Sequence, residues 1–263
     1  MAMTDIMGNG YETPRMHTGL IARLLPSFVF HIRSTLIVRK AGAKALRGQY
    51  GDADWAGSSL DIIRALEAVG VRLHIEGVEN FGKLKGPCVI IGNHMSTLET
   101  FALPGMIRPK IPVTFVVKES LIEYPIFGPV MRSRDPILVG RTNPREDLRA
   151  VLEGGEQRLR AGISIIIFPQ TTRALVFDPA EFNSIGVKLA KRAGVQVLPL
   201  ALKTDAWANG TVVKEFGKIN PEIPVHFRFG EPMYIKDRGT EEHQAIAEFI
   251  ERSLAEWKNE AKA

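Results

Sequence analysis

From residue 71 onward, short apolar segments alternate with longer amphipathic ones, and this alternation restricts the possible folds more than any other feature of the chain. Helical patterns lie at 97–107, at 119–131 with an interruption near Pro125, at 144–160 and at 182–193. A succession of strand, helix and strand predicts an α/β fold with a mostly parallel central sheet covered by helices. An alternating strand is expected at 71–76 and a buried strand at 87–92, with further strands at 112–117, 136–139, 163–168 and 195–202.

Four further segments complete the predicted fold. Residues 1–14 are expected to form a flexible lead-in, and 58–69 an amphipathic helix that ends at Gly70. The apolar positions of 225–229 alternate with polar ones, which predicts a half-buried strand near the edge of the sheet. The tail from 240 to about 258 is expected to be an amphipathic helix.

The chain contains one cysteine, Cys88, which excludes an intramolecular disulfide and a cysteine-rich metal site. Because Cys88 lies in an apolar strand, we expect a buried, inert thiol. A single cysteine is also compatible with a reducing, cytoplasmic compartment.

The N-terminal region is basic and amphipathic. No Asp or Glu occurs between Thr13 and Gly51, and residues 18–48 are expected to be helical in two segments, broken at Pro26 or near Gly42. The basic residues in this region are Arg15, Arg23, Arg33, Arg39, Lys40, Lys44 and Arg47. A helical apolar stripe is formed by Ile21, Leu24, Leu25, Phe28, Val29, Ile32 and Leu36.

This composition is typical of a helix that lies in a membrane interface with anionic lipids. Two alternatives are a helix that packs on the protein's own core and a nucleic-acid-binding segment. Nucleic-acid binding is disfavoured because phosphates have no use for the apolar stripe and no recognition motif is present. We therefore predict a membrane-association segment, 1–50, and an α/β domain, 51–263.

The membrane is not expected to be crossed. No apolar run approaches the ~18–20 residues that span a bilayer, and the N-terminus lacks the pattern of a secretory signal. These observations predict a peripheral or monotopic protein on the cytoplasmic face of the cell membrane.

A histidine follows the predicted strand at 87–92. His94 would lie at the carboxyl end of that strand, where open α/β sheets bind ligands. A carboxylate partner can fix the tautomer of a histidine and make it a general base, and Glu99 follows closely. Residues five apart in a regular helix are about 140° apart around its axis, so His94 should precede the helix that contains Glu99. The alternative is a capped turn in which Asn93 or Ser96 satisfies backbone groups.

Three cationic side chains follow other predicted strands. Lys118, Arg141 and Arg173 lie at or just beyond strand ends, so the fold would bring them near His94. Guanidinium groups bind phosphate through two parallel hydrogen bonds, which favours a phosphate ligand. Taken singly, each of the three is as compatible with a solvated surface residue.

Four segments follow one another along the chain: Asn93-His94-(four residues)-Glu99, Val139-Gly140-Arg141, Phe168-Pro169-Gln170-Thr171-Thr172-Arg173 and Val197-Leu198-Pro199-Leu200. In this order they resemble the four motifs of the glycerolipid (lysophospholipid) acyltransferase family, which includes 1-acylglycerol-3-phosphate acyltransferases. The N-terminal basic helix is similar to the membrane-docking helices of that family.

The resemblance implies acyl transfer from acyl-CoA or acyl carrier protein to a lysophospholipid hydroxyl, with lysophosphatidic acid and phosphatidic acid as the acceptor and product of phospholipid biosynthesis. His94 would be the general base and Glu99 its carboxylate partner. No metal and no cofactor beyond the acyl thioester is implied, and apolar side chains near the membrane would take the acyl chains. Arg141, Arg173 and Lys118 would bind the acceptor phosphate, with further substrate contacts from Asn93, Ser96, Gln170, Thr171 and Thr172.

Two departures from the family pattern bear on function. Glu99 replaces the usual aspartate but keeps its charge, so activity should survive. Gln170-Thr171 replaces Glu-Gly, which removes a negative charge and a flexible residue and leaves the acceptor open. Alternatives are therefore a non-catalytic lipid-binding relative and an acyltransferase with a different acceptor. A serine hydrolase is disfavoured because the chain lacks a Gly-x-Ser-x-Gly elbow.

Overall fold

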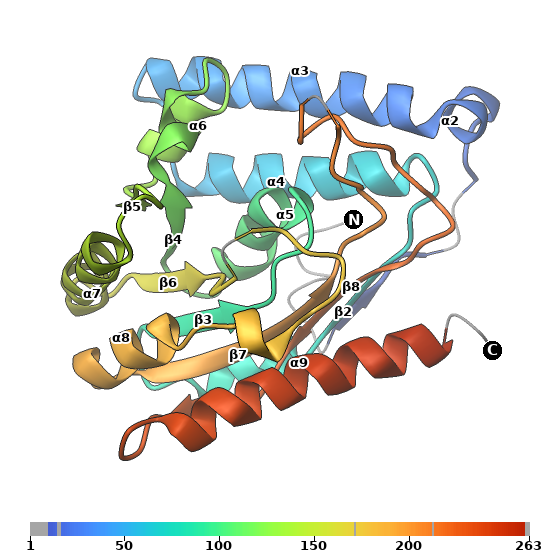
Figure 1. Cartoon of the computed structure of the whole chain (residues 1–263). Coiled ribbons are helices and arrows are strands. Elements are labelled where there is room, and N and C mark those ends of the chain that lie inside the picture. The colour runs from blue at the N-terminus through green and yellow to red at the C-terminus, as the bar shows by residue number, and fades with distance from the viewer. Residues whose placement is uncertain (1–9, 15–16, 171, 212, 261–263) are drawn as a thin grey trace.

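A mixed sheet covered by helices on both faces forms the centre of the molecule (Figure 1). The computed structural model describes residues 10–14, 17–170, 172–211 and 213–260. The strand order is β1-β2-β8-β7-β3-β6-β4-β5, and β9 pairs with β7. The strands are β1 (Gly10–Glu12), β2 (Leu73–Glu76), β3 (Cys88–Gly92), β4 (Val113–Lys118), β5 (Ile137–Val139), β6 (Ser164–Ile167), β7 (Gln196–Lys203), β8 (Val225–Phe229) and β9 (Met233–Tyr234).

Most of the sheet is parallel. β7, β3, β6, β4 and β5 are neighbours that run in the same direction, whereas β2 and β8 are parallel to each other and antiparallel to β7. The predicted mostly parallel, helix-covered sheet is confirmed. Because the five parallel strands end at one edge, the loops after β3, β4, β5 and β6 can converge there.

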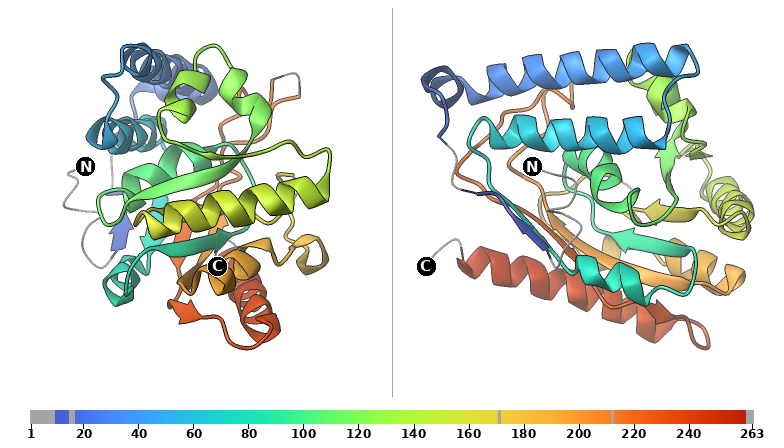
Figure 2. Two further views of the ribbon diagram at one scale, coloured as in Figure 1. Left: turned by 90° about the vertical axis from the view of Figure 1, so that its left-hand side faces the viewer. Right: turned by 180° about the vertical axis from the view of Figure 1, so that it is seen from behind.

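The helices form layers on the two faces of the sheet, as Figures 1 and 2 show from three directions. α4 (Asp52–Glu67) and α5 (Leu98–Ile107) cover one face. The other face is covered by α7 (Pro144–Arg160), α8 (Ile185–Ala193) and α9 (Thr240–Glu260). α3 (Pro26–Leu46), which follows α2 (Leu20–Leu24), packs on the outer side of α4. The shorter helices are α6 (Gly128–Arg132) and three 3-10 turns at Val78–Lys83, Glu119–Glu123 and Pro179–Glu181.

Two predictions about the chain before residue 70 are wrong in part. Residues 10–12, expected in a flexible lead-in, form β1, which is fastened because Tyr11 and Thr13 both donate to the buried Glu67 carboxylate, at 2.6 and 2.8 Å. Residues 1–9 lie outside the described part of the chain. The helix expected from residue 58 begins at Asp52, where two acidic side chains in the first turn favour a helix start.

The prediction that residues 225–229 form a strand near the sheet edge is also wrong in its placement. β8 lies between β2 and β7 and is covered on both faces. Its His226 is buried, because the Trp257 ring of α9 stacks on the imidazole with 4.8 Å between ring centroids. The alternation in 225–229 therefore reflects a polar residue packed beneath a helix rather than a solvent-facing strand.

The N-terminal helices break at Pro26, one of the two predicted positions, whereas Gly42 lies inside α3. A Cβ at Gly42 would lie 2.6 Å from the Ile126 carbonyl oxygen, so this glycine permits a close approach. α3 is joined to the core, since Phe30 is fully buried and the Ile219 N–H donates to Ser27 Oγ at 2.9 Å.

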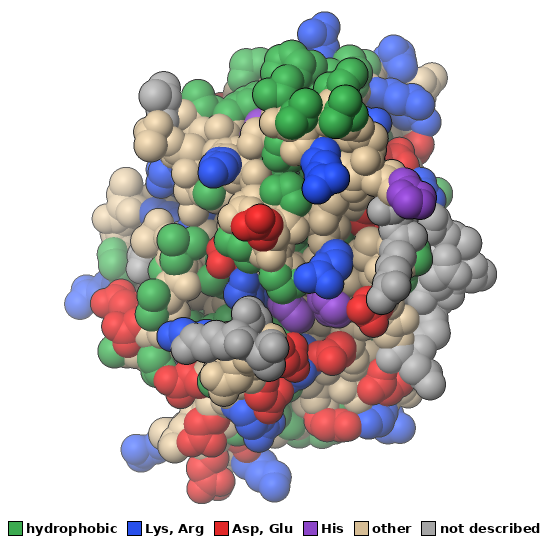
Figure 3. All heavy atoms as spheres, turned by 90° about the vertical axis from the view of Figure 1, so that its right-hand side faces the viewer, with side chains coloured by type: hydrophobic (Ala, Val, Ile, Leu, Met, Phe, Trp, Pro, Cys, Tyr) green, Lys and Arg blue, Asp and Glu red, His purple; other side chains and the backbone are tan. Residues whose placement is uncertain are grey.

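The predicted apolar stripe faces away from the core. Leu24 and Phe28 are 68% and 62% exposed, and Val29 alone of the seven stripe residues is half-buried. Figure 3 shows hydrophobic side chains gathered at the end of the molecule where α2 lies, with Lys and Arg side chains nearby. The alternative of a helix that packs on the protein's own core holds for the face of α3 that carries Phe30, whereas most of the predicted stripe lies outside that contact. Among the described residues, no helix is long and apolar enough to cross a membrane.

Candidate active site

The loop after β3 is fixed by a side chain that imitates a backbone. Asn93 Oδ1 accepts the Leu202 N–H at 2.9 Å, and Asn93 Nδ2 donates to the Leu202 carbonyl at 2.8 Å. Because β3 pairs with β7 up to Gly92 and Leu200, this amide continues the β3–β7 ladder beyond the end of β3. His94 is therefore placed relative to the sheet by its immediate neighbour.

His94 and Glu99 are in contact, as expected. Glu99 lies in the first turn of α5, and its Oε2 is 2.9 Å from His94 Nδ1. Because an ionised carboxylate only accepts hydrogen bonds, Nδ1 carries the proton of a neutral imidazole and Nε2 is left as the base. The imidazole stacks on Phe168, with centroids 4.6 Å apart and 5° between the planes.

The second oxygen of Glu99 is held by three donors. The N–H groups of Met95 and Ser96 donate to Oε1 at 3.1 and 2.8 Å, and the Thr204 hydroxyl bonds the same oxygen. The Ser96 hydroxyl in turn donates to Thr204 Oγ1 at 3.1 Å. Glu99 is completely buried, and these donors offset the cost of burying its charge.

Gln170 holds the same loop from the end of β6. Its Oε1 accepts the His94 N–H at 2.7 Å, and its side chain is buried. An amide retains the acceptor that a carboxylate would supply at this position, but it is neutral and also carries N–H donors.

A cavity of about 470 Å³ brings together most of the predicted site residues. His94, Lys118, Arg141, Gln170 and Arg173 all line it. The four strand ends expected to converge do so, and the cavity is rich in positive charge.

Three predicted substrate contacts lie elsewhere. Asn93 and Ser96 are 1% exposed and line neither this cavity nor its neighbour described below, because their polar atoms bond to the protein itself. Thr172 is exposed and also outside both cavities. Thr171 lies outside the described residues. The capped-turn alternative is therefore correct for Asn93 and Ser96, whereas His94 faces the cavity.

Arg141 is presented by a strained turn. Its φ of 59° is left-handed, which is unusual for a residue other than glycine, and the N–H groups of Gly140 and Arg141 both donate to the Asp147 carboxylate. Partial desolvation lowers the pKa of the Arg141 guanidinium, Asp147 opposes this shift, and Arg173 adds to it. Two guanidinium groups that repel each other at one cavity are stabilised by an anion between them.

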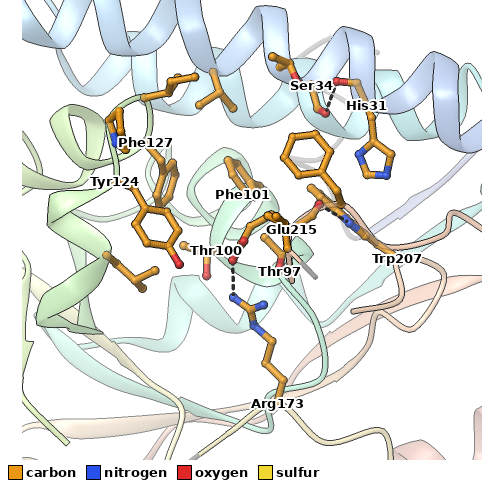
Figure 4. Close-up of a pocket in the computed structure, with 17 residues that line it drawn as sticks. His31, Ser34, Thr97, Thr100, Phe101, Tyr124, Phe127, Arg173, Trp207 and Glu215 are labelled. Carbon is orange, nitrogen blue, oxygen red and sulfur yellow. Dashed lines mark hydrogen bonds and ion pairs between the residues drawn. The ribbon is translucent and has the colours of Figure 1, made fainter. Parts of the chain in front are cut away.

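Arg173 lies at the boundary of a second cavity. This cavity has a volume of about 270 Å³ and a mostly apolar lining that includes Phe101, Phe127 and Trp207, with α3 along one side (Figure 4). Arg173 lines both cavities, and its guanidinium is 3.6 Å from Glu215 Oε1. A chain-like apolar group in the second cavity would thus lie beside the cationic first one.

Sequence reasoning missed several of these residues. Thr204, Phe168 as a stacking partner, and Glu215 gave no signal, because a threonine after a strand, an apolar residue in a strand and a glutamate in a loop are ordinary in any sequence. Among the described residues, no group of three or more His, Cys, Asp or Glu side chains forms a candidate metal site. Cys88 is buried as expected, and burial raises the pKa of its thiol to about 12.

Comparisons with known proteins converge on one family. Residues 72–203 match the family described as Acyltransferase. The chain is 33% identical over 195 residues to a 1-acyl-sn-glycerol-3-phosphate acyltransferase of Pseudomonas aeruginosa, which covers 74% of this chain and 70% of that protein. It is 33% identical over 121 residues to a probable 1-acyl-sn-glycerol-3-phosphate acyltransferase of Mycoplasma genitalium, covering 45% and 44% of the two chains.

The fold has a counterpart among solved structures. The crystal structure of the 1-acyl-sn-glycerophosphate (LPA) acyltransferase PlsC from Thermotoga maritima superposes with a TM-score of 0.66. The match covers 90% of this chain and 97% of that one at 21% sequence identity. At this identity, the likeness establishes the fold.

Proposed function

The chain belongs to the acyltransferase family, and we propose that it transfers a fatty acyl group from an acyl thioester to the free hydroxyl of 1-acyl-sn-glycerol-3-phosphate. The family expected from the four motifs is confirmed. The observation that carries the proposal is the His94–Glu99 pair, whose His94 lines a cavity that Arg141 and Arg173 also line. The names of the relatives support this acceptor.

The chemistry follows from the tautomer of His94. Nε2 accepts the proton of the acceptor hydroxyl as its oxygen attacks the thioester carbonyl carbon. When the tetrahedral intermediate collapses, the carbon–sulfur bond breaks and the departing thiolate takes the proton from Nε2. Glu99 stabilises the imidazolium between these steps, as a buried carboxylate does in a Ser-His-Asp arrangement. The substrate hydroxyl serves as the nucleophile, so no serine of the protein is required.

Substrate placement follows from the two cavities. Arg141 and Arg173, with Lys118 nearby, bind the acceptor phosphate, because they line the His94 cavity and guanidinium groups favour phosphate. The apolar cavity beside α3 takes a fatty acyl chain, with its carboxyl end directed towards Arg173 and His94. The donor is acyl-CoA or acyl carrier protein.

The α2–α3 surface docks on the membrane that supplies the substrate. Its exposed apolar side chains, with Arg33 and Arg39 among the exposed cations, suit the interface of an anionic leaflet, each basic residue adding about 1 kcal/mol of attraction. His31 and Val38 of α3 line the apolar cavity, so the docking helix also borders the acyl-chain site. Such docking corresponds to peripheral or monotopic attachment, which we place at the cytoplasmic face of the cell membrane as part of the proposal.

A panel of lysolipid acceptors tests the proposal. Wild-type protein is incubated with acyl-CoA or acyl carrier protein as donor, and product mass and free thiol are both measured. We expect thiol release that depends on 1-acyl-sn-glycerol-3-phosphate, a loss of at least about 10³-fold in His94→Ala, and no loss in the control His74→Ala, whose ring lies outside both cavities. Wild-type acyl transfer by His94→Ala would contradict the mechanism.

Two other outcomes correspond to the remaining alternatives. Product from a different lysolipid, which the neutral Gln170 favours, would change the acceptor but keep the chemistry. Lipid binding without thiol release from any donor would instead identify a non-catalytic relative.

A further inference from the structure

We propose that Thr204 is a positioning residue that controls the protonation of the His94–Glu99 pair through a relay of two hydroxyl groups. The inference rests on the proposed function, in which His94 is a general base. Thr204 lies directly after β7, far in sequence from the loop that contains His94, and it is completely buried.

The direction of the relay is fixed by chemistry. A hydroxyl group has one proton, and an ionised carboxylate has none to donate. Thr204 therefore donates to Glu99 Oε1 and accepts a hydrogen bond from the Ser96 hydroxyl, whose oxygen lies 3.1 Å away. Donation by Ser96 polarises the Thr204 hydroxyl and strengthens its bond to the carboxylate.

The relay ends on the Glu99 carboxylate, whose other oxygen contacts the His94 ring. Glu99 Oε1 has three donors, so Oε2 is left for His94 Nδ1. Two of the donors, the N–H groups of Met95 and Ser96, belong to the same loop as His94. Thr204 is the donor that comes from outside this loop, directly after β7, and it ties the carboxylate to the sheet.

The position of Thr204 is set by the Asn93 amide. β3 and β7 are in parallel register up to Gly92 and Leu200, and Asn93 adds a rung with Leu202. The chain after Leu202 consequently runs alongside the loop of residues 94–96. β7 is buried and apolar from Val197 to Leu202, so the buried hydroxyl of Thr204 just beyond the strand stands out from its surroundings.

Removal of the Thr204 hydroxyl has a defined electrostatic consequence. The carboxylate keeps two backbone donors but loses the hydroxyl dipole, so its negative charge acts more strongly on the imidazole. His94 then holds its proton to higher pH, and less of it is available as a base. Other charged side chains at the same cavity, which a change at residue 204 does not alter, are Lys118, Arg141, Asp147, Arg173 and Lys188. Asp205, the neighbour of Thr204, is paired with Lys203 at 2.8 Å.

The experiment compares Thr204→Val, which removes the hydroxyl but keeps the shape, with Thr204→Ser, which keeps the hydroxyl. We expect kcat/KM of Thr204→Val to fall about tenfold or more, the worth of a hydrogen bond to a charged group. The acidic limb of its rate profile should move to higher pH, while KM for the acceptor changes little. Thr204→Ser should restore both the rate and the limb.

Thr114→Val is the matched control. Thr114 is also buried, on β4, but its hydroxyl donates to the carbonyl oxygens of Arg134 and Asp135, at 2.7 and 3.3 Å. The Thr114→Val substitution should lower the melting temperature without shifting the pH dependence of the rate. A Thr204→Val variant that behaves like Thr114→Val would overturn the proposal.

An NMR titration of the His94 ring separates this inference from the proposed function, because it requires no substrate. His94 of Thr204→Val should titrate at higher pH than that of the wild type, even if the wild type shows no acyl transfer with the donors and acceptors used. If Thr204→Val does not fold, Ser96→Ala decides instead. A smaller shift in the same direction supports the relay, and an unchanged titration refutes it.

Discussion

The loop around His94 and the outer face of α2 and α3 depart from ordinary burial in opposite ways. In the loop, polar and charged side chains such as Asn93 and Glu99 are buried and held by two or more hydrogen bonds each. On the outer face, large apolar side chains such as Leu24 and Phe28 are left exposed. Folded proteins bury polar groups mainly where they are hydrogen-bonded and rarely expose wide apolar patches.

The two regions therefore serve different purposes: one holds catalytic atoms in place, and the other is suited to binding a surface. A fully bonded polar loop keeps catalytic atoms at fixed distances, whereas an exposed apolar surface gains free energy only when something else covers it. The two regions lie on either side of the adjoining cavities, with α3 shared between the outer face and the apolar cavity. Mutations in the two regions should consequently change different measurements.

The largest effect is expected in the loop. Glu99→Gln should lower kcat by about 10³-fold or more, because an amide can present a donor to Nδ1 and favour the wrong tautomer. Glu99→Asp, which keeps the charge, is the control and should retain more activity than Glu99→Gln. Steady-state kinetics with vesicle binding measured in parallel should show binding unchanged in both. Equal losses in the two variants would mean that the carboxylate does not set the tautomer.

A smaller effect is expected at the guanidinium groups between the two regions. Arg141→Ala or Arg173→Ala should raise KM for a phosphate-bearing acceptor about 10- to 100-fold, the worth of a charge-assisted hydrogen bond. Monoacylglycerol, which lacks the phosphate, should be used equally by wild type and variants.

The control for these variants is Arg149→Ala, since Arg149 is an exposed residue of α7 paired with Glu153. An equal loss with monoacylglycerol would show that the two arginines act on the chemistry rather than on the phosphate.

A change on the outer face of α2 and α3 should affect membrane binding and leave the catalytic activity unchanged. The double substitution of Leu24 and Phe28 by serine removes two exposed apolar side chains and should reduce sedimentation with anionic vesicles at least about tenfold. Full burial of each side chain would contribute roughly 1.5–3 kcal/mol to binding, and partial insertion into the interface retains only a part of this free energy. Activity on a short-chain, water-soluble acceptor should persist. Tyr234→Ser, on β9, is the control for loss of an exposed apolar side chain. Unchanged sedimentation at low salt would refute the assignment of this face.

The smallest effect is expected at the strand that leads into the loop. Because burial raises the pKa of Cys88 to about 12, its thiolate is scarce up to pH 9. A thiol-alkylating reagent should therefore leave the folded protein unmodified, and mass spectrometry should detect one adduct only after denaturation. Modification of the native protein at a rate near that of a free thiol would mean that β3 opens readily.

Much of the fold could be predicted from the sequence, because its signals are local. The helix at 144–160 has proline and acidic residues at its start and arginines at its end, and its bounds are those of α7. The break at Pro26 is likewise local. The place of β8 could not be predicted, since its order in the sheet depends on contacts with β2 and β7 rather than on its own residues.

The site divides in the same way. His94, Arg141 and Arg173 could be predicted because each follows a recognisable strand, and Glu99 because it is a carboxylate a few residues after His94. The sequence could not decide between a substrate contact and a capped turn for Asn93 and Ser96, because a polar residue beside a catalytic one can face either the substrate or the protein. Thr204 was missed because its importance depends on the β3–β7 register, which no short motif contains.

The side-chain hydrogen bonds between Asn93 and Leu202 also affect how sensitive the catalytic loop is to mutation. Every residue except proline retains its main-chain donor and acceptor, so the hydrogen bonds of a β-ladder survive most point mutations. The rung between Asn93 and Leu202 is encoded by one codon, and even aspartate would forfeit its donor. The alignment of the catalytic loop with the sheet is thus a trait that a single nucleotide change can remove and that selection can act upon.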